Sequence, residues 1–342
     1  MLAAEQAARG HRVHVARRRG GVHETRLRTT SVEVHELGDL RGLSPALVRR
    51  IDSIVRSTKP DVIQTWLPQM DIAGGLVALW RRVPWILSER ASKLAFDRRK
   101  PTTWIREFIG RRANAFVANS AAGADYWHRL AGGYASVATI RNAVDAESIR
   151  NAPAADRSLC SVGEKTLLVV GRLDHQKAVE VVIEATSLAS RRDFRVLVFG
   201  EGPLRARLDA EIKRSGLDGR VHLLPYLQEW WGLLRQASGL ISMSRFEGHP
   251  NVVLETMAAA CPLIVSDIPE HREFLDERSA LMVPRDDAGA LAQAIVTLLA
   301  EPSRARERAA RAADGLRGLT IAAAADAYDS IYRRLIVGGG TS

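Results

Sequence analysis

Short apolar runs alternate with longer segments of helical periodicity along the whole chain. Residues 166–170 ("TLLVV") and 195–199 ("RVLVF") are almost continuously apolar. Such runs are typical of strands buried on both faces of a parallel sheet, and their alternation with helices predicts an α/β fold with helices on both faces. The predicted strands are 12–16, 32–37, 61–66, 85–89, 115–120, 137–142, 166–173, 195–202, 221–226, 239–244, 262–267 and 280–284.

The length of 342 residues predicts two domains, because it exceeds what one ordinary hydrophobic core supports. A polar stretch without a sheet pattern lies near the middle, as expected for a linker. The final amphipathic segment predicts a helix that packs back on the N-terminal domain. We therefore expect an N-terminal Rossmann-like domain over 1–145, a linker over 146–162, a second Rossmann-like domain over 163–318 and the final helix over 319–336.

The first residues, "MLAAEQAARGHRVHVA", predict a helix, a C-cap at Gly10 and then a strand. A doubly wound domain normally opens with a strand that enters its first helix through a glycine-rich turn. Neither element precedes this helix in the sequence. Two interpretations stay open: the recorded start lies inside the first helix, or the protein lacks the opening strand.

The composition is that of a soluble globular protein, with 46% hydrophobic and 26% charged residues. The sequence has no apolar run of about 18 residues and no basic, apolar leader, which predicts a cytoplasmic protein. Cys160 and Cys261 lie among apolar neighbours without the spacing of a disulfide framework or metal site. We interpret both as reduced core residues.

The net charge of +10 is unevenly distributed. Residues 1–145 contain 24 Lys and Arg against 13 Asp and Glu, whereas the remainder contains 25 against 26. A basic N-terminal half suits a nucleic acid, an anionic membrane surface or a phosphorylated acceptor. An arginine-rich solvated surface explains the same numbers equally well.

Two cations follow the first strand of the second half, at the strand end where open α/β sheets bind ligands. A helix is expected to begin near Gln176, which places Lys177 in its first turn and Arg172 just before it. Cations are unfavourable at a helix N-terminus unless an anion such as phosphate lies between them and the exposed N–H groups. The alternative is that both side chains reach solvent or Asp174.

The next two strands end in less specific features. Gly200 and Gly202 let a backbone approach a ligand closely, but they equally make tight turns. The backbone after Tyr226 could bind a base edge, whereas Trp230 and Trp231 are better interpreted as packing residues.

Two glutamates lie in the stretch "SRFEGHPNVVLETMAAACPLIVSD". Glu247 lies in a turn, and Glu255 lies one to two turns into a helix that starts near Pro250. Singly, they could be a solvated turn residue and a helix N-terminal carboxylate. The helix is otherwise apolar and should be buried, where an ionised carboxylate needs a specific partner.

These segments resemble the retaining glycosyltransferases of family 4, also called glycosyl transferases group 1, which have a GT-B fold of two facing Rossmann-like domains. In the second half the resemblance rests on "GRLDHQK", "VFGEGP", "SRFEGHPNVVLETMAAACPLIVSDIPEHREFL" and "ALMVPRDDAGALAQAI". In the first half it rests on "LAAEQAARGHRVHV", "PDVIQTWLPQMDIAGGL", "WILSERAS", "ANSAAGADYW" and "IRNAVD".

The resemblance implies a metal-independent hexosyltransferase without a cofactor. It would move a sugar from a nucleotide-diphosphate donor to a glycan or lipid-linked acceptor in surface polysaccharide or glycoconjugate synthesis. By position, Arg172 and Lys177 would bind the diphosphate and stabilise the leaving group, Glu247 would contact the sugar and Glu255 the ribose. The remaining donor-binding positions would be Gly202, Leu227, Gly248, His249, Pro250, Asn251 and Val252.

The sequence also departs from the family. Ala178 stands where members usually have glycine, which we interpret as a minor change, and the glycine-rich turn of the N-terminal domain is missing. Candidate acceptor contacts are therefore Asp71, Glu89 and Arg90 in the remaining loops of that domain.

The sequence is also compatible with other functions. A non-catalytic or truncated protein that binds a nucleotide sugar or glycan is the main alternative. A dinucleotide oxidoreductase is disfavoured because "VFGEGP" does not complete G-x-G-x-x-G, and a nucleic-acid binder would not explain the glutamate pair. The segment 98–112 ("RRKPTTWIREFIGRR") suits peripheral attachment to the inner face of an anionic membrane, but a helix buried on its apolar face is the preferred interpretation.

Overall fold

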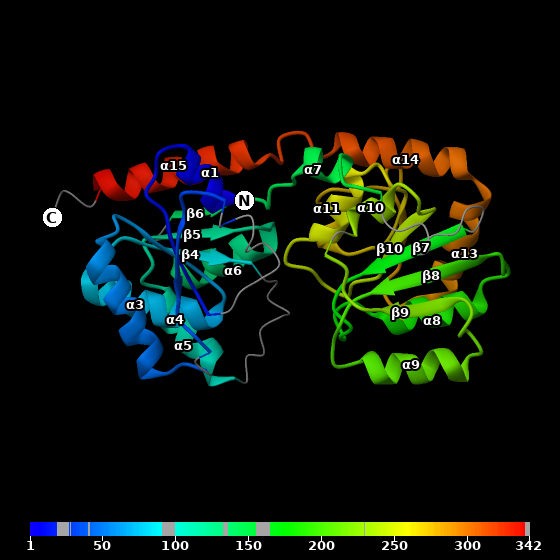
Figure 1. The fold of residues 1–342 in the computed structure, drawn as a ribbon, viewed down its shortest axis with the longest axis horizontal. Coiled ribbons are helices and arrows are strands. Elements are labelled where there is room, and N and C mark those ends of the chain that lie inside the picture. Colours follow the sequence, from blue (N-terminus) through cyan, green and yellow to red (C-terminus); the bar gives the residue numbers. More distant parts are fainter. Residues whose placement is uncertain are drawn as a thin grey trace. The chain divides into compact units, whose positions relative to one another are not determined.

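The structure is a computed structural model, and it describes residues 1–18, 27, 29–39, 42–90, 100–132, 136–154, 165–228 and 230–338. The chain divides into two compact units (Figure 1). One comprises Met1–Ala143 with Leu319–Ser342, and the other comprises Val144–Gly318. Cys160 and residues 155–162 of the predicted linker lie outside the described residues, whereas Cys261 is a buried free cysteine.

The C-terminal unit contains a six-stranded parallel sheet in the order β12-β11-β10-β7-β8-β9. Its strands are β7 (Lys165–Val170), β8 (Phe194–Phe199), β9 (Val221–Leu224), β10 (Gly239–Ser242), β11 (Leu263–Ser266) and β12 (Leu281–Val283). Its helices are α7 (Ala146–Arg150), α8 (Val179–Leu188), α9 (Arg205–Arg214), α10 (Trp231–Leu234), α11 (Asn251–Ala258), α12 (Pro269–Arg272), α13 (Ala288–Ala300) and α14 (Pro302–Asp314).

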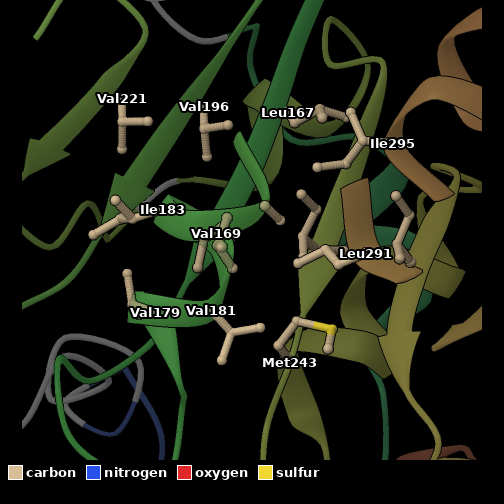
Figure 2. Packing of buried hydrophobic residues seen from close by; sticks show 14 of the residues in the cluster. Leu167, Val169, Val179, Val181, Ile183, Val196, Val221, Met243, Leu291 and Ile295 are labelled. Carbon is tan, nitrogen blue, oxygen red and sulfur yellow. The ribbon is translucent and has the colours of Figure 1, made fainter. Parts of the chain in front are cut away.

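Apolar side chains from the central strands form the main core of this unit. Figure 2 shows Leu167 and Val169 of β7 and Val196 of β8 among them, together with Val181 of α8 and Ile295 of α13. Because successive side chains of a strand point to opposite faces, nearly continuous apolar strands supply a core on each side of the sheet.

The strands of the N-terminal unit form two parallel sheets, β1-β2 and β3-β4-β5-β6. The strands are β1 (His14–Arg17), β2 (Glu33–Glu36), β3 (Ile63–Trp66), β4 (Trp85–Glu89), β5 (Ala115–Ala118) and β6 (Ser136–Thr139). The helices are α1 (Leu2–Ala8), α3 (Pro45–Thr58), α4 (Pro68–Arg81), α5 (Pro101–Gly110), α6 (Ala121–Ala131) and α15 (Ile321–Gly338).

Helix α3 illustrates how the sequence specifies these elements. The Ser44 side chain accepts a hydrogen bond from the Leu47 N–H at 3.2 Å, so the helix begins with a side-chain cap. Leu47, Ile51 and Val55 repeat at a spacing of four residues and are buried in one apolar cluster. Lys59 ends the helix in the left-handed conformation.

The predicted α/β fold with parallel sheets is confirmed, and each predicted strand segment overlaps an observed strand. The N-terminal unit differs from a complete doubly wound sheet, as expected for a Rossmann-like domain that lacks its opening strand. In the described part of the chain, no strand pairs with β1 on the side away from β2 or with β3 on the side away from β4. The six N-terminal strands, each of which was predicted, therefore form a two-stranded sheet and a four-stranded sheet.

The last helix, α15, lies in the N-terminal unit and packs beside α1. The Arg9 guanidinium donates to the Ala322 carbonyl at 3.1 Å and pairs with Asp326 at 2.5 Å. The Tyr332 hydroxyl accepts from Gln6 and donates to Gln64 of β3, a strand of the four-stranded sheet. Among the described helices, none is both long and apolar enough to cross a membrane.

Candidate functional site

The sheet of the C-terminal unit reverses its strand order between β7 and β10. From β7 the chain runs outward through β8 and β9, and it then returns to the other side of β7 as β10. At such a switch point the loops after the two neighbouring strands diverge and leave room for a ligand. The loops after β7 and β10 carry the predicted site residues Arg172, Lys177 and Glu247.

The loop after β7 is a turn rather than the start of a helix. One Asp174 carboxylate oxygen accepts the backbone N–H groups of Gln176 and Lys177 at 3.1 and 3.3 Å. Ala178 then adopts a left-handed φ of 47°, and α8 begins at Val179. The prediction that the helix begins near Gln176 is therefore wrong, because the aspartate satisfies these N–H groups in a turn.

The two predicted phosphate-binding cations have different surroundings. The Arg172 side chain is 78% exposed and pairs with Asp174, the carboxylate named by the alternative interpretation. The Lys177 side chain is 21% exposed, and its Nζ lies 2.6 Å from Glu247 Oε1. The structure thus brings together Lys177 and Glu247, which are separated by 70 residues in the sequence.

Glu247 is a buried carboxylate with three partners. Besides Lys177, the Ser244 hydroxyl donates to Oε1 at 2.6 Å and the Gln176 amide donates to Oε2 at 3.3 Å. The residue is only 5% exposed. An ionised carboxylate at this depth requires such partners, and they fix its position between the two loops.

Glu255 lies on α11 and faces α10. Its Oε2 accepts the indole N–H of Trp231 at 2.9 Å. Burial raises the pKa of Glu255, and the hydrogen bond from Trp231 opposes this effect. Burial and the nearby charge of Glu255 also raise the pKa of Tyr226, next to Leu227 in the loop after β9. The interpretation of Trp231 as packing only is wrong, because it holds a predicted ribose-binding carboxylate.

The segment from Gly248 to Val252 forms the entry to α11. Pro250 is the N-cap residue and Asn251 is the first helical residue, which confirms a helix start near Pro250. The His249 ring is 7% exposed and packs edge-on against Phe274. Packing therefore fixes this turn next to the buried Glu247.

The two glycines after β8 have a structural reason of their own. A Cβ on Gly200 would lie 1.9 Å from the Gly171 carbonyl oxygen, and one on Gly202 would lie 2.3 Å from the Leu173 carbonyl oxygen. They allow the turn after β8 to pack directly on the loop after β7. No ligand is needed to explain either residue.

Sequence reasoning assigned no role to Glu270 and His271, which follow β11. His271 is fully buried, burial lowers its pKa, and its Nδ1 lies 2.8 Å from the Ser266 carbonyl oxygen. The neutral ring therefore donates from Nδ1. Burial raises the pKa of Glu270, and the charge of Glu247 adds to this effect. The position after a strand end was the signal that could have identified both residues.

The predicted acceptor residues Asp71 and Glu89 are buried around Arg106 in the N-terminal unit. Their carboxylate oxygens lie 2.7 and 2.8 Å from the Arg106 guanidinium, and Trp127 donates its indole N–H to Glu89 at 3.1 Å. Burial raises the pKa of Asp71 to about 6. Both carboxylates thus have a structural function in the core.

Arg90, the third predicted acceptor residue, is also engaged within its own unit. Its guanidinium donates to the Tyr328 hydroxyl at 2.7 Å and to the Asn142 side chain. These contacts link the end of β4 to α15. An acceptor role for Asp71, Glu89 and Arg90 stays a prediction.

Two family models match the chain. Residues 164–301 match "Glycosyl transferases group 1", and residues 1–148 match "Glycosyltransferase Family 4". The first model covers the loops after β7 and β10 together with α10 and α11.

Individual proteins give consistent similarities. The chain is 31% identical over 160 residues to an N-acetylgalactosamine-N,N'-diacetylbacillosaminyl-diphospho-undecaprenol 4-alpha-N-acetylgalactosaminyltransferase from Campylobacter jejuni, covering 46% of this chain and 43% of that protein. It is 30% identical over 176 residues to an alpha-D-kanosaminyltransferase from Streptomyces kanamyceticus, covering 49% and 45%. The chain thus spans about half the length of these curated relatives.

The fold is shared with solved structures. HepE of Anabaena in complex with UDP-glucose matches with a TM-score of 0.83 at 16% identity, covering 96% of this chain and 93% of that chain. A likeness at this identity establishes a common GT-B fold.

Proposed function

The chain belongs to the group 1 glycosyltransferases of family 4, and on that premise we propose that it transfers a sugar from a nucleotide-diphosphate donor with retention at the anomeric carbon. Support comes from the convergence of Lys177 and Glu247 at the switch point of the C-terminal sheet, with a 2.6 Å contact between them. The diphosphate of such a donor requires a cation, and its sugar hydroxyls require a hydrogen-bond acceptor. Lys177 and Glu247 supply one of each.

In this proposal the cations serve the leaving group. Departure of a nucleoside diphosphate develops negative charge, which Arg172 and Lys177 stabilise without a metal or cofactor. The exposed Arg172 is free to move from Asp174 to a phosphate, because its present ion pair is solvated.

The two glutamates accept hydrogen bonds from the sugar and the nucleoside. Glu247, with the turn from Gly248 to Val252, contacts the transferred sugar, while Glu255 accepts the ribose hydroxyls. The loop backbone at Leu227 meets the base, and Gly202 is the remaining donor-binding position of the proposal. Glu255 needs no general-base role here, because reading a diol requires only an acceptor.

The reaction is tested by incubating the protein with nucleotide sugars and following release of nucleoside diphosphate, with the anomeric configuration of the product read by proton NMR. We expect slow release that an acceptor accelerates, with retained configuration. Binding without any release would favour the alternative of a non-catalytic protein that binds a nucleotide sugar. An inverted product would contradict the proposal.

We further propose that the acceptor is a surface glycan or its lipid-linked precursor, reached at the inner face of the membrane. The name of the Campylobacter jejuni relative includes an undecaprenol-linked acceptor. In this chain, α5 exposes Trp104 by 67% and Phe108 by 63%, so the preferred interpretation of this helix as buried on its apolar face is wrong. The neighbouring α4 exposes Trp80 by 68%.

Arginines accompany these exposed aromatic residues. The Arg81 guanidinium lies 4.7 Å from the Trp80 ring, and the Arg112 guanidinium lies 4.4 Å from the Phe108 ring. Aromatic rings at the interface combined with cations favour an anionic bilayer surface.

Vesicle co-sedimentation tests this location. We expect binding to vesicles of phosphatidylglycerol and phosphatidylcholine, little binding to phosphatidylcholine alone, and at least tenfold weaker binding after Trp104→Glu with Phe108→Glu. Leu188→Glu, at a 57% exposed apolar position on α8, is the matched control and should bind like the parent. Equal binding of all three proteins would contradict a membrane role for α5.

A further inference from the structure

A second cluster of chemically competent side chains lies on the small β1-β2 sheet of the N-terminal unit. His14 lies opposite Glu33 in the parallel register, and His35 is two residues further along β2. Since side chains alternate between the two faces of a strand, all three lie on one face of this sheet. None of them takes part in the proposed donor chemistry.

The three side chains converge. His14 Nδ1 lies 3.1 Å from His35 Nε2 and 3.4 Å from Glu33 Oε2. One potential ligand atom from each of the three residues lies within 4.8 Å of the other two. Ligand atoms at roughly 2.0–2.1 Å from a tetrahedral zinc ion are about 3.3–3.4 Å apart. The two distances from His14 Nδ1 lie near this value. The Glu33–His35 separation is at most 4.8 Å, and the Glu33 side chain, which is 60% exposed, can rotate to close it around an ion.

A hydrogen bond between the two imidazoles is the competing explanation. His14 Nδ1 faces both His35 and Glu33, and a single proton on this nitrogen serves two acceptors poorly. His14 Nε2 is buried without a partner among the described residues, so no contact there fixes the proton on Nδ1. A cation between the three atoms satisfies all of them at once.

We propose that His14, His35 and Glu33 bind one zinc-type divalent transition-metal ion, with water as the fourth ligand. Two imidazoles and one carboxylate are ligands that suit zinc and its neighbours rather than calcium or magnesium. The ion joins β1 to β2 and stabilises this small sheet. It is independent of sugar transfer, whose proposed donor residues belong to the C-terminal unit.

Untagged, chelator-treated protein tests the site. Titration with Zn²⁺ by calorimetry should give one ion per chain and raise the melting temperature. Co²⁺ should give the visible absorption of a tetrahedral site. His35→Gln and Glu33→Gln should each weaken Zn²⁺ binding at least tenfold, and Glu33→Gln alters an exposed side chain and should fold normally.

The matched control is His128→Gln, at an exposed position on α6 of the same unit, which should bind Zn²⁺ like the parent. Circular dichroism in the presence of chelator should be the same for every variant, and nucleotide-sugar binding should not change. Absence of Zn²⁺ binding by the parent, or unchanged binding by both His35→Gln and Glu33→Gln, would overturn the site.

Discussion

At the scale of single residues, Glu247 owes its position to partners that are distant in the sequence. The apolar context of the helix predicted that the two glutamates need specific partners. It could not identify Lys177 or Ser244 for Glu247, or Trp231 for Glu255, because those contacts depend on how strands and loops meet. Composition and spacing predict that a buried carboxylate has a partner, but only the tertiary structure identifies that partner.

Lys177 and Glu247 should be strongly coupled, and removing one side chain should cost more unfolding free energy than removing the other. Lys177→Ala leaves Glu247 buried and should cost about 2 kcal/mol or more of unfolding free energy. Glu247→Ala should cost less, because the partly exposed lysine reaches water. A double-mutant cycle by urea denaturation should give a coupling energy of about 1–3 kcal/mol. Additive effects would show that the contact contributes nothing.

Glu255 should make the protein less stable at neutral pH than its amide variant. Because burial raises its pKa, the folded chain holds this proton more tightly than the unfolded chain. Its contribution to stability is complete below the unfolded pKa and is lost as pH rises through the folded pKa. Glu255→Gln cannot ionise and keeps an acceptor for Trp231. Its melting temperature should exceed that of the parent at pH 7.5 and equal it at pH 4. A lower melting temperature at pH 7.5 would contradict this account.

At the scale of elements, strands were the most predictable part of the chain. Nearly continuous apolar runs identified β7 and β8, which are largely buried, and shorter apolar runs between helical segments identified the other strands. The start of α8 was mispredicted because Asp174 and the left-handed Ala178 form a turn first. Ala178 stands where family members usually have glycine, and its positive φ supplies the physical reason for that preference.

The turn after β8 should not tolerate a side chain. Gly202→Ala would place a Cβ 2.3 Å from the Leu173 carbonyl oxygen and 2.7 Å from its backbone nitrogen. Neither backbone atom moves without displacing the loop that carries Lys177, so the cost should be at least about 2–3 kcal/mol. Gly219→Ala, where a Cβ meets nothing within 4 Å, is the control and should change stability little. Equal melting temperatures for the two variants would refute the close packing.

At the scale of the whole molecule, the charge asymmetry follows the two units. The basic half of the chain contributes the exposed aromatic and arginine residues of α4 and α5, whereas the nearly neutral remainder contains the proposed donor site. Sequence alone predicted this division, because charge can be counted along the chain. The sequence also indicated an N-terminal domain without its opening strand, and the division of the N-terminal strands into two sheets agrees with this. The order in which the strands pair was not predicted, since strand pairing is decided between distant segments.

The central claim is that the C-terminal unit binds a nucleotide-diphosphate sugar through Arg172 and Glu255. Isothermal titration with UDP-, GDP- and ADP-sugars tests it most directly, using the parent, Arg172→Ala, Glu255→Ala and the control Arg207→Ala at an exposed position on α9. The account predicts that at least one donor binds the parent and Arg207→Ala equally, and binds the other two variants at least tenfold more weakly. Failure of every donor to bind the parent, or equal binding by all four proteins, would contradict it.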